Sequence, residues 1–158
     1  MRRVTDKKLL IQLSLTSLAA IFPMKSFAQS LSCPQQLVFG QVITCGSPGT
    51  VTVNPDGTSS SSCVTASGPV SRARCVVTQS FPFRPIQFSI SGTSFNISNG
   101  TTNMAVNNFN MFTNSGGCCT TTQTVPLLDV PIGARLNVGA TQAQGNYSGS
   151  FGVTAILQ

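Results

Sequence analysis

Residues 145–158 read GNYSGSFGVTAILQ, and the alternation within this stretch indicates the fold class. At every second position from Tyr147 to Leu157 the residue is aromatic, aliphatic or small, and the residues between are mostly serine, threonine or glycine. Because successive side chains of a β-strand point to opposite faces, residues 147–157 are predicted to form a strand with one apolar face. The members of that face that carry a side chain are Tyr147, Phe151, Val153, Ala155 and Leu157.

The chain between residue 28 and this stretch shows the same kind of pattern. Short alternating runs are separated by turn residues such as Asn-Pro-Asp-Gly at 54–57, and no helical period persists. Such runs predict an all-β, immunoglobulin-like sandwich of about 7–9 antiparallel strands. The predicted strands are residues 37–44, 50–54, 73–78, 86–91, 95–98, 103–112, 124–130, 135–139 and 147–157.

The first 28 residues have the composition of a targeting segment. Basic residues precede the apolar run 9–22, which at fourteen residues is too short to span a bilayer. Ser26 and Ala28 are small residues at the positions that a signal peptidase reads. We expect residues 1–28 to be a secretory signal peptide and residues 29–158 to form one exported domain without a membrane span. A retained membrane anchor is the alternative.

Removing this segment changes the charge of the chain. The formal net charge is +6, and residues 1–28 contribute +4 of it through five basic residues and one acidic residue. The remaining +2 comes from four scattered arginines and two aspartates, with no lysine. These arginines form no basic stripe that could neutralise a row of phosphates. We therefore expect no binding to nucleic acid.

The residue types that are absent argue against catalysis. The chain contains no histidine, glutamate or tryptophan, and residues 29–158 contain only Asp56 and Asp129 as carboxylates. A Ser-His-Asp or Cys-His site requires an imidazole, and acid–base catalysis normally uses histidine or a tuned carboxylate. A calcium site needs several carboxylates, and zinc would depend on thiolates that an exported protein tends to oxidise. The sequence predicts a protein that is not an enzyme and holds no cofactor or metal.

An even number of cysteines in an exported chain argues for disulfides. Cys118 and Cys119 are adjacent, so their Cα atoms lie about 3.8 Å apart, closer than the roughly 4.4–6.8 Å of most disulfides. We therefore expect each of them to bond a different earlier cysteine and to link their loop to the N-terminal half. The six candidates are Cys33, Cys45, Cys63, Cys75, Cys118 and Cys119.

A second disulfide arrangement stays open. If Cys118 and Cys119 bond each other, the remaining four cysteines can form two local pairs, each closing thirteen residues. Those pairs would be Cys33–Cys45 and Cys63–Cys75. In both arrangements the bonds are structural, because no basic neighbour is in view to lower a thiol pKa and favour a redox role.

Two groups of apolar residues outside the closing strand are expected in the core. Residues 81–86 (FPFRPI) carry two aromatic side chains between predicted strands, and packing at a crossover is favoured over an exposed binding patch. Met104, Phe109, Met111 and Phe112 fall in the predicted strand 103–112 and are also expected to be buried.

Four stretches carry a family resemblance: LVFG at 37–40, GTVTVNPDG at 49–57, IGARLNVGA at 132–140 and GNYSGSFGVT at 145–154. In this order they resemble the bacterial exported family called domain of unknown function 4402, over residues 37–157. The chain departs from the family pattern in its cysteines and in its final AILQ. The family's ending is similar to that of chaperone–usher fimbrial subunits and spore-coat-U-like pilins, which implies a pilin-like sandwich.

This resemblance implies a non-enzymatic structural subunit of a cell-surface fimbrium, assembled by strand complementation. The expected partners are a periplasmic chaperone, an outer-membrane usher and other copies of the chain or related subunits. The expected location is the periplasm in transit and then the cell surface. The apolar face of the closing strand would be the assembly face. Sortase-type cross-links need lysine, which residues 29–158 lack, and the long apolar helix of type IV pilins is missing as well.

The short segment before Cys33 bears on how such a subunit would assemble. A donor strand should precede the domain as a free arm, but residues 29–32 are few for that role. Residues 31–43 could be the donor themselves, or the chain could be a terminal subunit. The alternative function is a self-contained, secreted or surface-attached binding domain of the adhesin kind, and a small exported enzyme or inhibitor is a third.

Overall fold

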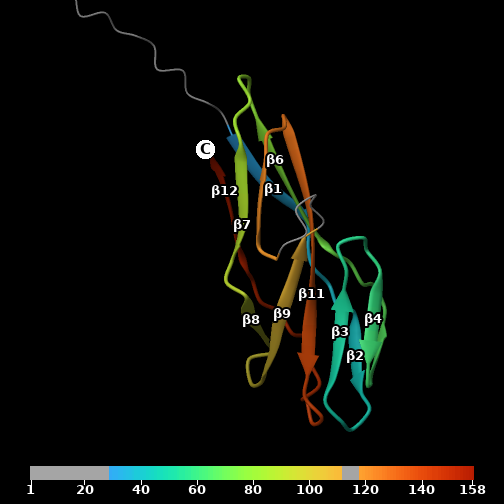
Figure 1. Ribbon diagram of the computed structural model, residues 1–158. Coiled ribbons are helices and arrows are strands. Elements are labelled where there is room, and N and C mark those ends of the chain that lie inside the picture. Colours follow the sequence, from blue (N-terminus) through green and yellow to red (C-terminus); the bar gives the residue numbers. More distant parts are fainter. Residues whose placement is uncertain (1–28, 112–117) are drawn as a thin grey trace, which may run out of the picture.

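The computed structural model describes residues 29–111 and 118–158, which form β-strands in antiparallel pairs and contain no helix (Figure 1). The prediction of an all-β domain is confirmed. The twelve strands of these residues are β1 (Gln29–Gln35), β2 (Gln41–Thr44), β3 (Gly49–Val53), β4 (Ser59–Ser62), β5 (Val64–Ser67), β6 (Ala73–Gln79), β7 (Ile86–Ser91), β8 (Ser94–Ser98), β9 (Asn103–Met111), β10 (Thr120–Gln123), β11 (Leu127–Val138) and β12 (Gly152–Leu157).

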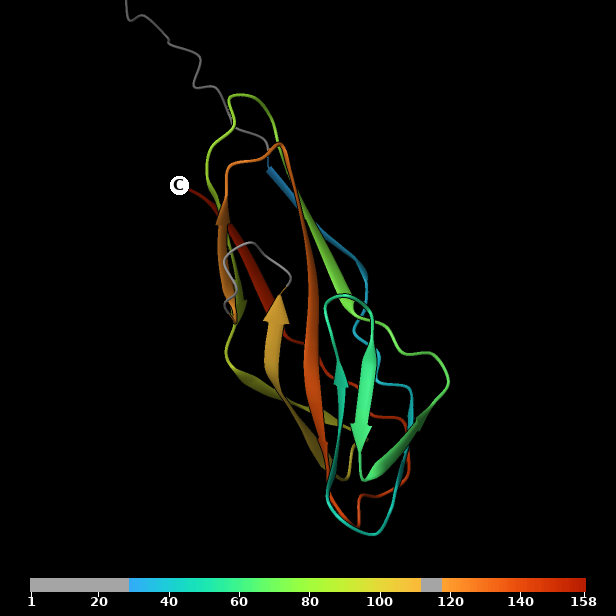
Figure 2. The same cartoon turned by 45° about the vertical axis from the view of Figure 1, so that its right-hand side comes forward.

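Two sheets make the body of the domain. The larger has seven strands in the order β1-β6-β11-β3-β4, with β9 and then β8 joined to the other edge of β11. The smaller has the order β10-β7-β12, and β2 and β5 form a separate pair. Figure 2 shows β10, β7 and β12 to the left of β11, and β6 and β1 to its right. The arrangement is a β-sandwich.

The core lies between the inner faces of these sheets. In β7 every second side chain points inward, and Ile86, Phe88 and Ile90 are 0%, 0% and 5% exposed. In β6 the inward residues include Cys75 and Val77, which are 1% and 0% exposed. Each fully buried side chain of the size of isoleucine or phenylalanine stabilises the fold by about 1.5–3 kcal/mol. The period-2 pattern of these strands therefore explains both the sheets and their packing.

Strand β11 connects the two halves of the larger sheet. Residues Leu127–Ile132 pair with β6, residues Ala134–Val138 pair with β3 on the same edge, and β9 pairs with the other edge. The sequence predicted two strands here, at 124–130 and 135–139, because proline and glycine at 131 and 133 resemble a break. That prediction is wrong, since partners on both edges hold these residues in one continuous strand.

Several short strands were not predicted. β1, β4 and β10 have few apolar residues and little alternation, and β5 is an alternating run of only four residues, so their positions follow from pairing with β6, β3, β7 and β2. The predicted strand 37–44 is reduced to β2 and to one bridge between Val38 and Ser71. The predicted strand 147–157 is reduced to β12 and to one bridge between Ser148 and Ser98.

The two expected apolar groups have different outcomes. Phe81 and Phe83 are 81% and 44% exposed, so the prediction that the two aromatic side chains of residues 81–86 pack in the core is wrong, whereas Ile86 is buried as the first residue of β7. The two phenylalanines lie in the β6–β7 connection, where their rings contact each other edge to face, 5.7 Å between centroids. Met104, Phe109 and Met111 are buried as predicted, at 7%, 3% and 2% exposure, and Phe112 lies outside the described residues.

The turn between β3 and β4 is held by an aspartate. The Asp56 carboxylate accepts hydrogen bonds from the Thr58 hydroxyl at 2.6 Å and from the Thr58 backbone N–H at 2.8 Å. These bonds, the hydroxyl first, lower the pKa of Asp56 below its ordinary value of 3.8. Hydrogen bonds to the charged form favour that form, so the turn is most stable with Asp56 ionised.

Replacing Thr58 by valine should therefore raise the pKa of Asp56 toward its ordinary value. A lowered folded pKa means that the ionised turn stabilises the fold above the unfolded pKa. That contribution disappears as the pH falls through the folded pKa, in a window below about pH 4. The measurement is a carboxyl chemical-shift titration by NMR. Thr65→Val in β5 is the matched control and should leave the pKa of Asp56 unchanged, and an equal pKa in wild type and Thr58→Val would contradict the assignment.

Candidate functional site: the open edge of β12

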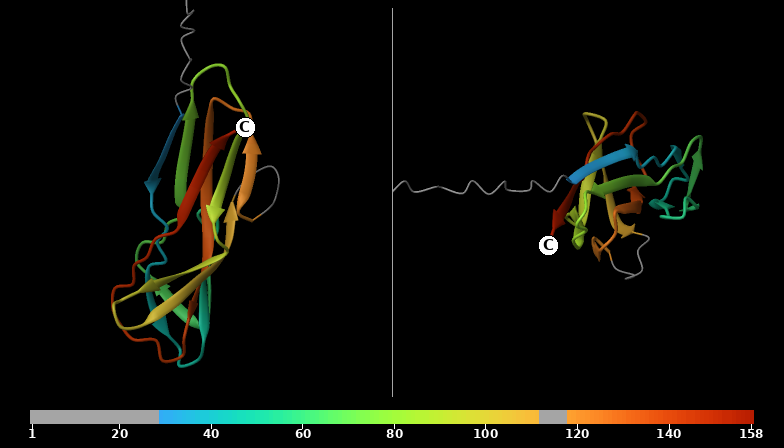
Figure 3. Two further views of the ribbon diagram at one scale, coloured as in Figure 1. Left: turned by 90° about the vertical axis from the view of Figure 1, so that its left-hand side faces the viewer. Right: turned by 90° about the horizontal axis from the view of Figure 1, so that it is seen from above.

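The closing strand β12 forms one edge of its sheet. It pairs with β7 in continuous register from Gly152 opposite Ser91 to Leu157 opposite Ile86. Within the described part of the chain no strand pairs with the other edge of β12. Figure 3 (left) shows β12 and β1 on the side that faces the viewer, with β6 seen between them. Each of the two sheets therefore ends in an edge strand on this side of the molecule.

The alternation of hydrogen-bonded pairs along β12 determines which of its backbone N–H and C=O groups face the open edge. The Gln158 N–H donates to the Pro85 carbonyl oxygen at 2.9 Å, which makes these two residues a hydrogen-bonded pair. In an antiparallel ladder such pairs alternate along the strand, so Gly152, Thr154 and Ile156 also bond β7. The N–H and C=O groups of the residues between them must point away from β7. Those residues are Val153, Ala155 and Leu157.

A hydrogen bond on the other edge of β7, toward β10, agrees with this alternation. The Ile90 N–H donates to the Cys119 carbonyl oxygen at 2.9 Å, so Ile90 bonds toward β10 and not toward β12. Ile90 lies opposite Val153. Because the backbone groups of Ile90 point toward β10, Ile90 and Val153 form a pair without hydrogen bonds between them. The outward groups of β12 are therefore three N–H donors and three C=O acceptors.

The apolar face predicted for the closing strand packs inward but is incompletely covered. All five predicted residues lie against the buried core cluster and are partly exposed, whereas the inward residues of the neighbouring strand β7 are buried. Phe151 contacts the rings of Phe95 and Phe109, with centroids 5.5 and 5.2 Å apart. The five residues are Tyr147, Phe151, Val153, Ala155 and Leu157.

Strand β1, across from β12, also has an inward side chain that is partly exposed. Leu31 lies directly opposite Val77 in the antiparallel pair with β6, so both side chains point to the same face of the sheet. Val77 is 0% exposed, but Leu31 is 39% exposed although it points toward the core. The interior of the sandwich is thus partly open between β1 and β12.

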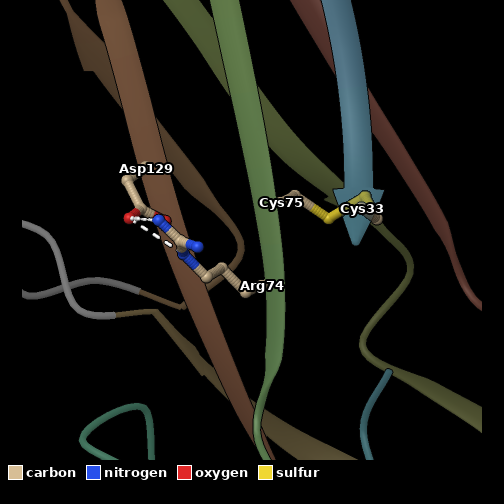
Figure 4. The surroundings of a disulfide bond; sticks show 4 residues. All are labelled: Cys33, Arg74, Cys75 and Asp129. Carbon is tan, nitrogen blue, oxygen red and sulfur yellow. Dashed lines mark hydrogen bonds and ion pairs between the residues drawn. A yellow bond between two sulfur atoms is a disulfide. The ribbon is translucent and has the colours of Figure 1, made fainter. Parts of the chain in front are cut away.

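A disulfide fixes β1 at this edge. Cys33 of β1 bonds Cys75 of β6, with Cα atoms 4.0 Å apart. Figure 4 shows this bond on one side of β6 and Arg74 on the other side. Arg74 donates to both carboxylate oxygens of Asp129 in β11, at 2.6–3.0 Å, and these hydrogen bonds raise the pKa of Arg74. Neighbouring residues of β6 therefore hold β1 covalently and β11 by an ion pair.

Of the two arrangements considered for the sequence, the disulfides match only the Cys118–Cys119 bond of the second. All six candidate cysteines are bonded, but Cys118 bonds Cys119, with Cα atoms 3.7 Å apart, so the expected links from these two residues to earlier cysteines are wrong. The alternative local pairs are wrong as well, because strand pairing sets the partners. Thr44 lies opposite Val64 in the β2–β5 pair, which brings the residues just outside these strands together. Those residues are Cys45 and Cys63, with Cα atoms 5.6 Å apart.

The described residues contain no group of three or more histidine, cysteine or acidic side chains that could hold a metal ion. Among the same residues no helix is long and apolar enough to cross a membrane. Sequence reasoning identified the inward face of the closing strand, but it did not identify Leu31 as part of the same open side. The apolar residue at 31, two positions before a cysteine, was the signal that could have placed it there.

The fold and the disulfides place the protein in the class of all-β sandwiches linked by disulfide bonds. The chain belongs to the family described as domain of unknown function (DUF4402), whose model matches residues 30–156. The family resemblance inferred from the sequence motifs is therefore confirmed. No curated protein and no solved structure matches the chain.

Proposed function

We propose that this protein is a non-enzymatic, fimbrial or pilus-like structural subunit of the cell surface, and that a strand from a partner completes its sandwich beside β12. The observation that carries the proposal is the partly exposed inward face of β12, next to a β7 whose inward face is buried. An added strand would cover Val153, Ala155 and Leu157 and would bond the outward backbone groups of the same three residues.

The composition of β12 supports this use of its edge. Edge strands that must not pair with other chains usually carry lysine, proline or a bulge. Residues Gly152–Leu157 contain no charged residue and no proline, and their register with β7 is unbroken. An incoming strand with apolar residues at alternate positions would place them between Leu31 and the inward face of β12. The register would then be set by alternate side chains, as in other cases of strand addition.

The proposal includes a route to the cell surface. Residues 1–28 would direct export as a signal peptide. A subunit with an open interior exposes apolar surface until it is completed, so a periplasmic chaperone would cover the β12 edge and an outer-membrane usher would receive the complex. Other copies of the chain, or related subunits, would then supply the completing strand.

Replacing Ala155 by proline tests this assignment. The Ala155 N–H points to the open edge, so proline should leave the ladder to β7 intact while its ring blocks an approaching strand. The full chain is exported to the bacterial periplasm. We expect the wild-type protein to form assemblies or chaperone complexes and the Ala155→Pro variant to be a folded monomer. Size-exclusion chromatography with light scattering separates these states. Ala155→Val retains the N–H and should behave as wild type.

A second proline variant controls for damage to the fold. The Ile156 N–H bonds β7, so Ile156→Pro removes a ladder bond and should lower the free energy of unfolding by about 1–3 kcal/mol, whereas Ala155→Pro should cost much less. A wild-type chain that is a monodisperse monomer with reversible melting would contradict the proposal and favour the self-contained binding domain. Equal assembly of wild type and Ala155→Pro would contradict the role of the β12 edge.

A further inference from the structure

A second feature lies away from the β12 edge, around the middle of β11. Arg135 lies between Ala134 and Leu136, each 1% exposed, and strand alternation therefore directs the Arg135 side chain to the outer face of the larger sheet. It is flanked in register by Thr52 of β3 and Asn107 of β9. Figure 1 shows β3, β11 and β9 side by side.

A depression of about 590 Å³ lies beside Arg135. This volume is within the 300–1,000 Å³ that is typical of small-molecule sites. Polar side chains from four separate segments surround it, and neither β1 nor β12 contributes to it. The residues that line it are Thr52, Val53, Asn54, Thr93, Asn108, Phe109, Asn110, Cys118 and Arg135.

Close packing of two turns shapes the walls of this depression. A Cβ atom at Gly133 would lie 2.2 Å from the Val53 carbonyl oxygen and 2.9 Å from atoms of Asn54 and Pro55, so the chain that leaves β3 packs closely against β11 and brings Asn54 beside Arg135. On the other edge of β11 the register with β9 shifts, and Asn108 adopts a φ of 51°. Asparagine tolerates this left-handed conformation better than most residues. The irregularity places two asparagines at the rim.

Several polar side chains of the depression make no hydrogen bond or ion pair with other described residues. In the described part of the protein the Arg135 guanidinium has no ion pair, and no hydrogen bond joins the side chains of Asn108 or Asn110 to another residue. None of the described lining residues is acidic. The depression therefore combines one unpaired positive charge with amide and hydroxyl groups that can both donate and accept.

We propose that this depression binds a carboxylated saccharide unit. A guanidinium can hold a carboxylate through two parallel hydrogen bonds, which gives both strength and orientation. The amides of Asn108 and Asn110 and the hydroxyls of Thr52 and Thr93 match the alternating donors and acceptors of sugar hydroxyl groups. The Asn54 Nδ2 donates to the Thr58 hydroxyl at 2.9 Å, so Asn54 offers its side-chain oxygen as an acceptor. The proposal is independent of strand assembly, because its residues lie on β3, β9, β11 and their connections.

Titration with three small probes tests this site. The exported domain, labelled with nitrogen-15, is titrated with galacturonate, with galactose, which lacks the charge, and with acetate, which lacks the hydroxyl groups. Galacturonate should shift the amide signals of Asn108, Asn110 and Arg135. Galactose should bind at least about tenfold more weakly, because it lacks the charge-assisted bidentate contact, which contributes more than 1.4 kcal/mol. Acetate keeps that contact but should also bind at least about tenfold more weakly, because it lacks the hydrogen bonds of the sugar hydroxyl groups.

Arg135→Gln is the decisive variant. Its side chain is exposed on the outer face, so the variant should remain folded, and its affinity for galacturonate should fall about tenfold or more. Arg84→Gln removes the same charge from the β6–β7 connection, outside the depression, and should bind as wild type. Absence of galacturonate binding, equal binding of galactose, or an unchanged affinity in Arg135→Gln would each overturn the proposal, whatever the outcome of the assembly experiment.

Discussion

Replacing Cys33 and Cys75 together by alanine should lower the free energy of unfolding by about 4 kcal/mol, on the chain-entropy relation for a cross-linked loop. The two residues are 42 positions apart in the sequence, so their bond removes many conformations from the unfolded chain. Cys75 is also 1% exposed, so the substitution removes a buried sulfur from the core. Denaturant unfolding under oxidising conditions measures the loss.

The Cys45–Cys63 bond supplies the matched control. It closes a shorter segment, with a separation of 18, and both residues are exposed, so its removal should cost about 3 kcal/mol at most. Amide exchange separates the two variants further. Loss of Cys33–Cys75 should speed exchange in β1, including Leu31, and loss of Cys45–Cys63 should not. An equal or smaller effect of the Cys33–Cys75 variant on stability and on β1 would show that the bond does not hold this edge.

Replacing Gly133 by alanine should lower the free energy of unfolding by about 3 kcal/mol, which is the range of serious overpacking in a closed structure. The added Cβ would lie 2.2 Å from the Val53 carbonyl oxygen and 2.9 Å from atoms of Asn54 and Pro55. Because the first of these atoms belongs to the backbone of β3, relief requires β3 and β11 to separate. Thermal or denaturant unfolding followed by circular dichroism measures the effect.

Gly139→Ala is the control for this substitution. Its Cβ would meet only the flexible Gln142 side chain, at 3.4 Å, so stability should change by no more than about 0.5 kcal/mol. Similar stabilities of Gly133→Ala and Gly139→Ala would contradict the close packing of residues 53–55 against Gly133. Because Val53 and Asn54 also line the depression beside Arg135, Gly133→Ala should weaken galacturonate binding as well.

The strands with strong alternation could be predicted from the sequence, and the polar ones could not. Ile86, Phe88 and Ile90 identify β7 directly, because a period of two is visible within six residues. β4 consists of four serines and β1 has Leu31 as its one large aliphatic residue, so neither has a local pattern. These strands form because a partner strand offers backbone hydrogen bonds, which is information from distant parts of the chain.

The candidate site could be predicted only in part for the same reason. Alternation identified the face that includes Val153 and Leu157, because a face depends on the strand's own residues. Which edge of the strand lacks a partner depends on the whole sheet order, and the place of Leu31 depends on its pairing with Val77. The residues around Arg135 come from segments up to about eighty positions apart, so no local motif joins them.

The bond between Cys33 and Cys75 also restricts how two copies of the chain could combine. In domain swapping, copies of a chain exchange an identical element, and an edge strand, which pairs on one side only, is one such element. β1 is such a strand, but its covalent link to β6 keeps it within its own molecule while the bond is intact. Two copies therefore cannot dimerise by trading β1. Any strand that closes the sandwich beside β12 must be added to a complete set of strands, and its removal would leave the original domain unchanged.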